Sequence, residues 1–193
     1  MRLTLLRHGD TAGTKLGLYY GATDLPITAE SEAELKRRAS KGVFPKANRY
    51  FTSGMKRTEQ SFAAMYGETP HEVIPDLREI NLGDFEMRAY EELKNDPAFI
   101  EWCTGDNEKN VCPGGESGEQ VTERALAALL PIVEAGEDAV VIAHGGVIGG
   151  VLARLFPNPV GRFAFSLKPG TGYTVEFDGI SPVTYYKVPD EKE

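Results

Sequence analysis

Two of the three histidines of the chain occupy the same kind of position: each follows an apolar run and directly precedes a glycine. His8 comes after residues 3–6 and Arg7, whereas His144 comes after the uninterrupted apolar run 139–143. Such runs are typical of strands buried in a parallel sheet, and ligands bind just beyond the carboxyl ends of those strands. Histidine can also act as a nucleophile that forms a covalent intermediate. The pair therefore predicts a reactive anion site at one edge of a sheet.

An arginine and a carboxylic acid extend this site. Arg57 follows another short strand candidate, where it is placed to converge with Arg7 on a phosphate, whose oxygens match the guanidinium fork. Glu79 lies in a loop after a strand candidate, and a carboxylic acid there could protonate the leaving alkoxide of a phosphate ester. Asp84 and Glu86 are weaker candidates for the same task. The structural alternatives are an exposed helix arginine and solvated loop acids.

Composition limits the classes of function. With 193 residues the chain has the size of a single domain, 1–193. Its formal net charge of −8 argues against a nucleic-acid surface and against docking on anionic lipid. No stretch is long enough to span a bilayer, and the N-terminus does not resemble a signal peptide, so we expect a cytoplasmic protein. Cys103 and Cys112 are expected to be reduced thiols, although a single disulfide between them is left open.

Hydrophobic periodicity and capping residues predict alternating strands and helices, which indicates an α/β fold with a largely parallel sheet. Thr28 is expected to cap one helix, and Ser117 with Gln120 forms a capping-box pattern at the start of another. The expected strands are 2–7, 49–52, 72–74 and 139–143, with 174–177 and 183–188 as a closing hairpin or two edge strands. The expected helices are 29–40, 56–66, one near 88–94, one near 97–103, one from 117 to about 133, and one from about 146 to 156.

Together these motifs resemble the histidine phosphatase superfamily, which includes the cofactor-dependent phosphoglycerate mutases and their phosphatase relatives. The resemblance extends from residue 2 to about residue 155 and implies a phosphoglycerate mutase-like fold: a three-layer αβα sandwich with a mostly parallel central sheet. It rests on Leu6-Arg7-His8-Gly9-Asp10-Thr11, residues 20–28, Ser53 through Arg57 to Gln60, Leu77-Arg78-Glu79 through Leu82-Gly83, residues 113–117, and Ala143-His144-Gly145-Gly146.

The resemblance also implies catalytic roles. His8 matches the histidine that attacks phosphorus and becomes phosphohistidine. Arg7, Arg57 and His144 match the residues that hold the phosphoryl oxygens, and Glu79 matches the acid that protonates the leaving group and later activates water. Phosphoryl transfer depends mainly on positioning and on stabilisation of oxygen charge, which these groups can supply without a metal or a cofactor.

Further residues are expected to contact the substrate: Thr11, Thr14, Tyr20, Gly21 and Gly145. Two positions depart from the family's pattern, which in many members has asparagine and arginine where this chain has Thr14 and Leu18. Thr14 retains a hydroxyl that can form a hydrogen bond, whereas Leu18 cannot contact phosphate as a cation. The substrate edge near Tyr20 is therefore expected to be more apolar than usual.

Residues 80–115 are expected to form a lid or specificity insertion. Mutase members carry a longer insertion with paired arginines and a lysine, whereas this segment offers only Arg88, Lys94 and Lys109 as cations between Glu79 and Pro113. It also contains eight acids, which would disfavour a carboxylate-bearing phosphoglycerate: Asp84, Glu86, Glu91, Glu92, Asp96, Glu101, Asp106 and Glu108.

Hydrolysis of a phosphate monoester is therefore favoured, in the manner of small bacterial phosphatases similar to α-ribazole phosphatase. The alternatives are phosphoglycerate mutase-type transfer and a non-catalytic module that binds a phosphorylated ligand. The expected partner is a small phosphorylated metabolite rather than a nucleic acid or a membrane, and a homodimer is compatible with the sequence.

Overall fold

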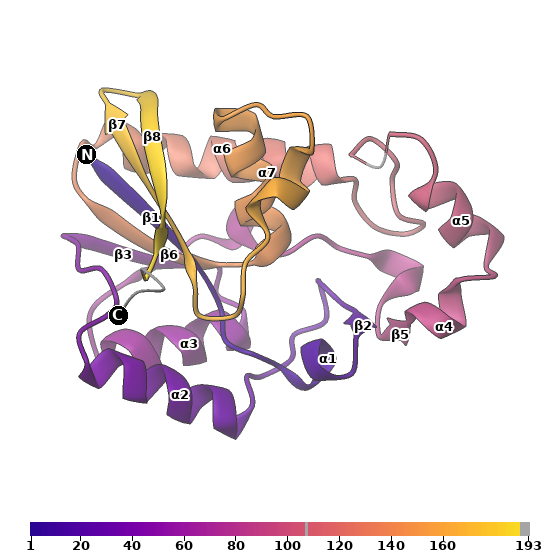
Figure 1. Ribbon diagram of the computed structural model, residues 1–193, viewed down its shortest axis with the longest axis horizontal. Coiled ribbons are helices and arrows are strands. Elements are labelled where there is room, and N and C mark those ends of the chain that lie inside the picture. The colour runs from indigo at the N-terminus through magenta and orange to yellow at the C-terminus, as the bar shows by residue number, and fades with distance from the viewer. Residues whose placement is uncertain (107, 190–193) are drawn as a thin grey trace.

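Six strands form the central sheet of the computed structural model, which describes residues 1–106 and 108–189 (Figure 1). The strand order across the sheet is β4-β3-β6-β1-β7-β8. The first four are parallel, and β7 and β8 form an antiparallel edge, which confirms the expected mostly parallel sheet and closing hairpin. The strands are β1 (Arg2–Arg7), β3 (Arg49–Thr52), β4 (Glu72–Val73), β6 (Ala139–Ala143), β7 (Gly172–Asp178) and β8 (Ser181–Val188).

Helices cover both faces of the sheet, which confirms the αβα sandwich. The pair α2 (Ala29–Ser40) and α3 (Lys56–Tyr66) lies on one face, and the pair α6 (Gly118–Glu134) and α7 (Gly145–Leu155) lies on the other (Figure 1). In β6, Ile142 belongs to the core cluster beneath α2 and α3, while Val141 belongs to the cluster beneath α6 and α7. Since successive strand residues point to opposite faces, this strand is apolar throughout because both of its faces are buried.

The predicted caps fix where two of these helices begin. The Thr28 hydroxyl accepts a hydrogen bond from the Ser31 amide at the start of α2. At α6, Ser117 and Gln120 form the reciprocal capping box. These side chains satisfy backbone N–H groups that have no partner inside the helix. The local sequence therefore sets the start of both helices.

The 80–115 segment packs on a small core of its own, to one side of the sheet (Figure 1). It contains β5 (Arg88–Ala89), α4 (Tyr90–Leu93) and α5 (Pro97–Cys103), and β5 pairs with β2 (Leu18–Tyr19). The helix expected near 88–94 is thus shorter, because its first residues form a strand. The buried residues of the small core are Leu82, Phe85, Leu93, Phe99 and Cys112.

Short elements escaped prediction because they contain less than two helical turns or only a few strand residues. These are the four-residue helix α1 (Ala12–Lys15), the two-residue strand β2, and three 3₁₀ helices at Pro75–Leu77, Gly83–Phe85 and Gly161–Phe165. Cys103 is exposed and Cys112 is buried, and both are free thiols.

Candidate active site

The two glycine-linked histidines lie side by side at the carboxyl edge of the sheet. β1 and β6 are adjacent and parallel, with Arg7 opposite Ala143 in the register, so the next residue of each strand is a histidine. The His8 amide donates to the Ala143 carbonyl at 3.1 Å, and the two imidazole centroids are 5.1 Å apart. The sheet topology therefore brings together residues that are 136 positions apart in the chain.

Hydrogen bonding determines the tautomer of His8. Its Nδ1 lies 2.7 Å from the Gly9 carbonyl oxygen, which can only accept, so Nδ1 carries the proton. Burial and, to a smaller extent, the neighbouring Arg57 and Arg7 cations lower the pKa of His8 to about 3, although the hydrogen bond to Gly9 works to raise it. The second ring nitrogen, Nε2, consequently keeps a free lone pair at neutral pH. His8 is in the protonation state that a nucleophile requires.

The tautomer of His144 follows in the same way. Arg57 Nε donates to His144 Nδ1 at 3.2 Å, so the proton of a neutral ring must lie on Nε2, which donates to the Ser53 hydroxyl at 2.8 Å. Burial, followed by the charges of His8 and Arg57, holds the pKa of His144 well below its usual value. Sequence reasoning assigned no role to Ser53, since only the fold places it beside a ring 91 residues away.

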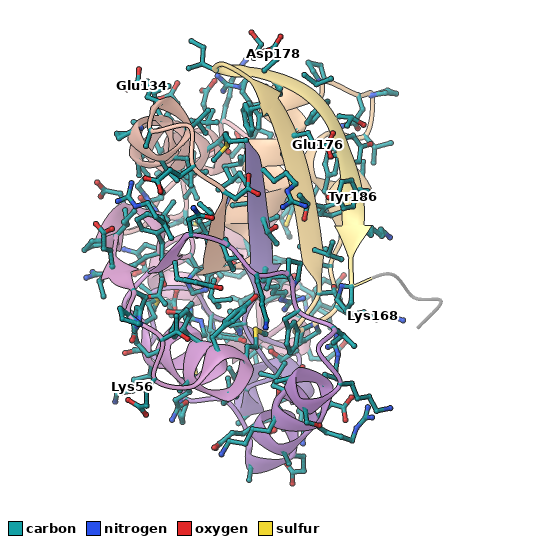
Figure 2. The ribbon with its side chains drawn as sticks, turned by 90° about the vertical axis from the view of Figure 1, so that its left-hand side faces the viewer. Lys56, Glu134, Lys168, Glu176, Asp178 and Tyr186 are labelled. Atoms are coloured by element: carbon teal, nitrogen blue, oxygen red, sulfur yellow. The ribbon has the colours of Figure 1, made fainter. Side chains whose placement is uncertain are left out.

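Arg57 is fully buried at the start of α3 and forms the inner cationic wall of the site. Its two terminal nitrogens donate to the carbonyls of Thr23 at 2.9 Å and Gly21 at 2.6 Å. The neighbouring Lys56 is exposed at the edge of the molecule (Figure 2). The structural alternative of an exposed helix arginine is therefore wrong for Arg57.

Arg7 supplies the second guanidinium. Its Nη1 donates to the Leu167 carbonyl at 2.6 Å. Its Nε is buried and has no hydrogen-bond partner among the described residues. An unsatisfied buried donor costs about 1–3 kcal/mol, so an anion bound beside His8 would relieve a cost that the folded chain already carries.

The Glu79 carboxylate is held at the N-terminus of α7. Its Oε2 accepts from the Gly146 amide at 3.0 Å, and its Oε1 accepts from the Ile80 amide at 3.1 Å. A Cβ at position 146 would lie 2.6 Å from Glu79 Oε1, so glycine is required for this approach. The structure thus brings Glu79 from its loop to the same helix terminus that His144 precedes.

Glu86 has a structural role and does not act as the proton donor. Its two oxygens accept hydrogen bonds from the backbone amides of Gly21, Ala22, Thr23 and Leu82, and from the Thr23 hydroxyl. Burial works to raise the pKa of Glu86, but these hydrogen bonds outweigh it and lower the pKa below the usual value. Glu86 also does not line the cavity beside His8, so it is not placed to protonate a leaving group there.

One cavity of about 400 Å³ contains the reactive groups Arg7, His8, Arg57 and Glu79. A larger cavity, of about 640 Å³, shares only Glu79 with it. The outer part of the first cavity is uncharged, and its lining there consists of Thr14, Gly17, Leu18, Tyr19, Tyr20, Leu82 and Tyr90. The substrate edge near Tyr20, which was expected to be apolar, is thus uncharged but carries hydroxyl groups.

Three of the predicted contact residues, Thr11, Gly21 and Gly145, do not line this cavity. The Thr11 hydroxyl caps α1 and donates to the Tyr20 hydroxyl at 2.7 Å, while the Thr14 hydroxyl lies 2.7 Å from the same oxygen. Gly21 passes so close to the backbone of Ile80 that a Cβ would lie 1.7 Å from its oxygen. Gly145 is the first residue of α7, with Arg7 packed above it.

The eight acids of the 80–115 segment do not line the cavity that holds His8. Several are paired elsewhere: Asp96 bonds Arg88, Glu91 bonds Lys94, Asp106 bonds Lys109, and Glu108 bonds Arg162. The expectation that lid acids would repel a carboxylate-bearing substrate is therefore wrong, because these acids do not reach the cavity. What the outer cavity lacks is a cation.

The third histidine of the chain, His71, lies outside this cavity. It is half-buried, its ring centroid lies 4.2 Å from that of Phe62, and its Nε2 lies 2.9 Å from Glu59.

Across residues 1–106 and 108–189, no three metal-binding side chains gather in one place. In the same ranges, every helix is too short or too polar to cross a membrane.

Comparisons with known proteins agree with this geometry. A model of the histidine phosphatase superfamily (branch 1) matches residues 3–184. The adenosylcobalamin/alpha-ribazole phosphatase of Salmonella typhimurium is 28% identical over 166 residues, covering 82% of this chain and 81% of that protein. The 2,3-bisphosphoglycerate-dependent phosphoglycerate mutase of Xanthobacter autotrophicus is 28% identical over 167 residues, covering 79% and 80%. The structure of Bacillus stearothermophilus YhfR aligns with a TM-score of 0.83 at 25% identity, covering 98% of this chain and 96% of that one.

Proposed function

Because the chain belongs to the histidine phosphatase superfamily, we propose that it hydrolyses phosphate monoesters of small metabolites through a phosphohistidine on His8. The observation that carries the proposal is the state of this residue. Its Nδ1 proton is bound to Gly9, its pKa is about 3, and it shares one cavity with two arginines and a carboxylic acid. This combination supplies a nucleophile, charge stabilisation and a proton donor.

The first half of the reaction transfers the phosphoryl group to the protein. The Nε2 lone pair of His8 attacks phosphorus, and the bond between phosphorus and the ester oxygen breaks. Glu79 gives its proton to the leaving oxygen, which departs as an alcohol. Arg7 and Arg57 stabilise the charge on the equatorial oxygens, and Arg7 Nε gains the partner it otherwise lacks.

The second half returns His8 to its starting state. Glu79, now a carboxylate, takes a proton from water as the water oxygen attacks phosphorus. The bond between phosphorus and Nε2 breaks, and inorganic phosphate leaves. Neutral His144 orients Arg57 through its Nδ1, and Ser53 orients His144. In this scheme His144 acts by fixing the guanidinium that faces the phosphoryl group.

The cavity favours hydrolysis over the mutase alternative. Identity does not separate them, because the chain is 28% identical to a relative of each kind. Among the described residues, the cations that line the cavity are Arg7 and Arg57, so a substrate carboxylate would be desolvated without a further counter-charge, which is costly. The 80–115 segment, which supplies Leu82 and Tyr90 to the lining, acts as the lid that selects the leaving group.

An assay with two substrates tests the proposal. The protein should hydrolyse p-nitrophenyl phosphate, and it should do so equally well with EDTA present, because the reaction uses only side chains. 3-Phosphoglycerate with 2,3-bisphosphoglycerate should be interconverted more slowly than the aryl ester is hydrolysed. Interconversion that outruns hydrolysis would identify a mutase, and absence of both would leave only a binding module.

The cytoplasmic location and a homodimer are further parts of the proposal, to be checked by cell fractionation and by light scattering.

A further inference from the structure

We infer that the alcohol released by this phosphatase is uncharged and carries a flat aromatic ring, which Tyr90 contacts at the mouth of the cavity. The inference rests on the proposed function and adds the chemical class of the substrate. It comes from the outer cavity, whose composition the hydrolytic chemistry itself does not explain.

The outer cavity has a hydrophobic wall with aromatic faces. Leu18 and Tyr19 reach it from β2, and Leu82 and Tyr90 reach it from the 80–115 segment. Because β2 pairs with β5, and α4 begins at Tyr90 directly after β5, a single two-stranded ribbon fixes both tyrosines beside the same opening. The wall is therefore built into the fold at two chain segments.

Tyr90 is positioned for a ligand more than for the protein core. Its side chain is 56% exposed, although it lines a cavity. One side of it is supported, since its ring centroid lies 6.3 Å from that of Phe99, on which Tyr19 also packs at 5.3 Å. A large aromatic side chain that is supported on one side and exposed on the other offers a face for offset or edge-to-face contact with a second ring.

Charge excludes the main alternatives. The charged residues that line the cavity are Arg7, Arg57 and Glu79, and the phosphoryl group and the leaving oxygen engage all three. A carboxylate farther out on the alcohol would meet only leucine, glycine, threonine and tyrosine side chains, and it would lose solvation without forming an ion pair. An ammonium there would meet only a tyrosine face, which is a weak contact at an exposed site. An uncharged ring suits the same surface.

Three esters that differ only in the distal group test this inference: ethyl phosphate, 2-cyclohexylethyl phosphate and 2-phenylethyl phosphate. All release primary alcohols of similar basicity, so proton donation by Glu79 is matched among them. We expect kcat/KM to be about tenfold higher for the phenyl ester than for the ethyl ester, the range expected for one aromatic contact with its area burial. The cyclohexyl ester should fall between the two, and O-phosphoserine should be the poorest substrate.

Substitutions at Tyr90 assign the effect to this residue. In Tyr90→Ala the ratio of kcat/KM between phenyl and ethyl esters should fall toward one, whereas Tyr90→Phe should preserve the ratio because the ring remains. Tyr186→Ala removes another exposed tyrosine, which lies on β8 (Figure 2) and does not line the cavity, and should leave the ratio unchanged.

Equal kcat/KM for the three esters, or a preference for phosphoserine, would overturn the assigned substrate class while leaving the hydrolase intact. A cyclohexyl ester that matches the phenyl ester would overturn the requirement for a flat ring. Failure to hydrolyse any of the esters, together with p-nitrophenyl phosphate, would instead overturn the proposed function.

Discussion

At the scale of single residues, the two histidines of the site differ in which ring nitrogen is free. His8 donates from Nδ1 to a carbonyl and keeps Nε2 available, whereas both nitrogens of His144 are bound, by Arg57 and Ser53. In the proposed mechanism, the same pair of motifs therefore supplies one nucleophile and one positioning residue. The difference arises from tertiary partners and not from the motifs themselves.

Replacing Glu79 by Gln should slow esters with basic leaving groups far more than esters with acidic ones. An alkoxide cannot leave without a proton, whereas p-nitrophenolate can. We expect a loss of roughly 10²–10⁴-fold for ethyl phosphate, the usual contribution of a general acid, and a much smaller loss of kcat/KM for p-nitrophenyl phosphate. Steady-state kinetics on both esters measure this. Equal losses would show that Glu79 is not the proton donor.

At the scale of elements, Glu86 connects the 80–115 segment to the phosphate site. Its carboxylate binds the amides of the 21–23 loop, and the carbonyls of Gly21 and Thr23 in that loop bind Arg57. The position of the guanidinium therefore depends on a side chain of a segment that does not itself touch it. This dependence gives the segment a second role beside shaping the cavity.

Replacing Glu86 by Gln should weaken binding of inorganic phosphate by about tenfold, because losing hydrogen bonds to a charged acceptor costs roughly 1.5–3 kcal/mol, part of which loosens Arg57. Competitive inhibition by phosphate measures the change. Asp138→Asn is the control, because this half-buried carboxylate likewise binds a backbone amide and a guanidinium, both of Arg2, and precedes β6 at the end of the strand opposite to His144. If the two variants bind phosphate equally, Glu86 does not position the site.

The length and the local signals of each element explain which elements could be predicted from the sequence. Long apolar runs such as 139–143 and capped starts such as Thr28 and Ser117 carry their own signal, and these elements formed where expected. The ribbon of β2 and β5 has only two residues in each strand, so no period could be seen. The roles of Ser53 and Glu86 depend on partners distant in sequence, which no local pattern reveals.

At the scale of the whole molecule, an acidic chain with a net charge of −8 contains a site formed by one buried arginine, one half-buried arginine and two buried neutral imidazoles. Both histidines have lowered pKa values in the fold. The unfolded chain therefore binds more protons than the folded one below a pH of about 6.5, and stability falls as the pH decreases from there. For His8 the loss continues down to its folded pKa of about 3.

The free energy of unfolding should thus fall between pH 7 and pH 5, by about 2 kcal/mol for each buried histidine. Urea denaturation at pH 7 and pH 5 measures this decrease, and most carboxyl groups titrate below this pH range. In His8→Asn one titrating group is removed, and the decrease should be smaller than in the native protein by about the same amount. An unchanged decrease would mean that His8 is not held neutral by the fold.

The most direct test of the phosphohistidine is to trap it. Rapid acid-free quenching of the protein after mixing with ³²P-labelled phosphoryl donor, followed by peptide mass spectrometry, should locate a base-stable, acid-labile phosphoryl group on Nε2 of His8. His8→Ala should show no label, since no other side chain serves as nucleophile. Label on another residue, or label that persists in His8→Ala, would contradict the assignment of His8 as the residue that receives the phosphoryl group.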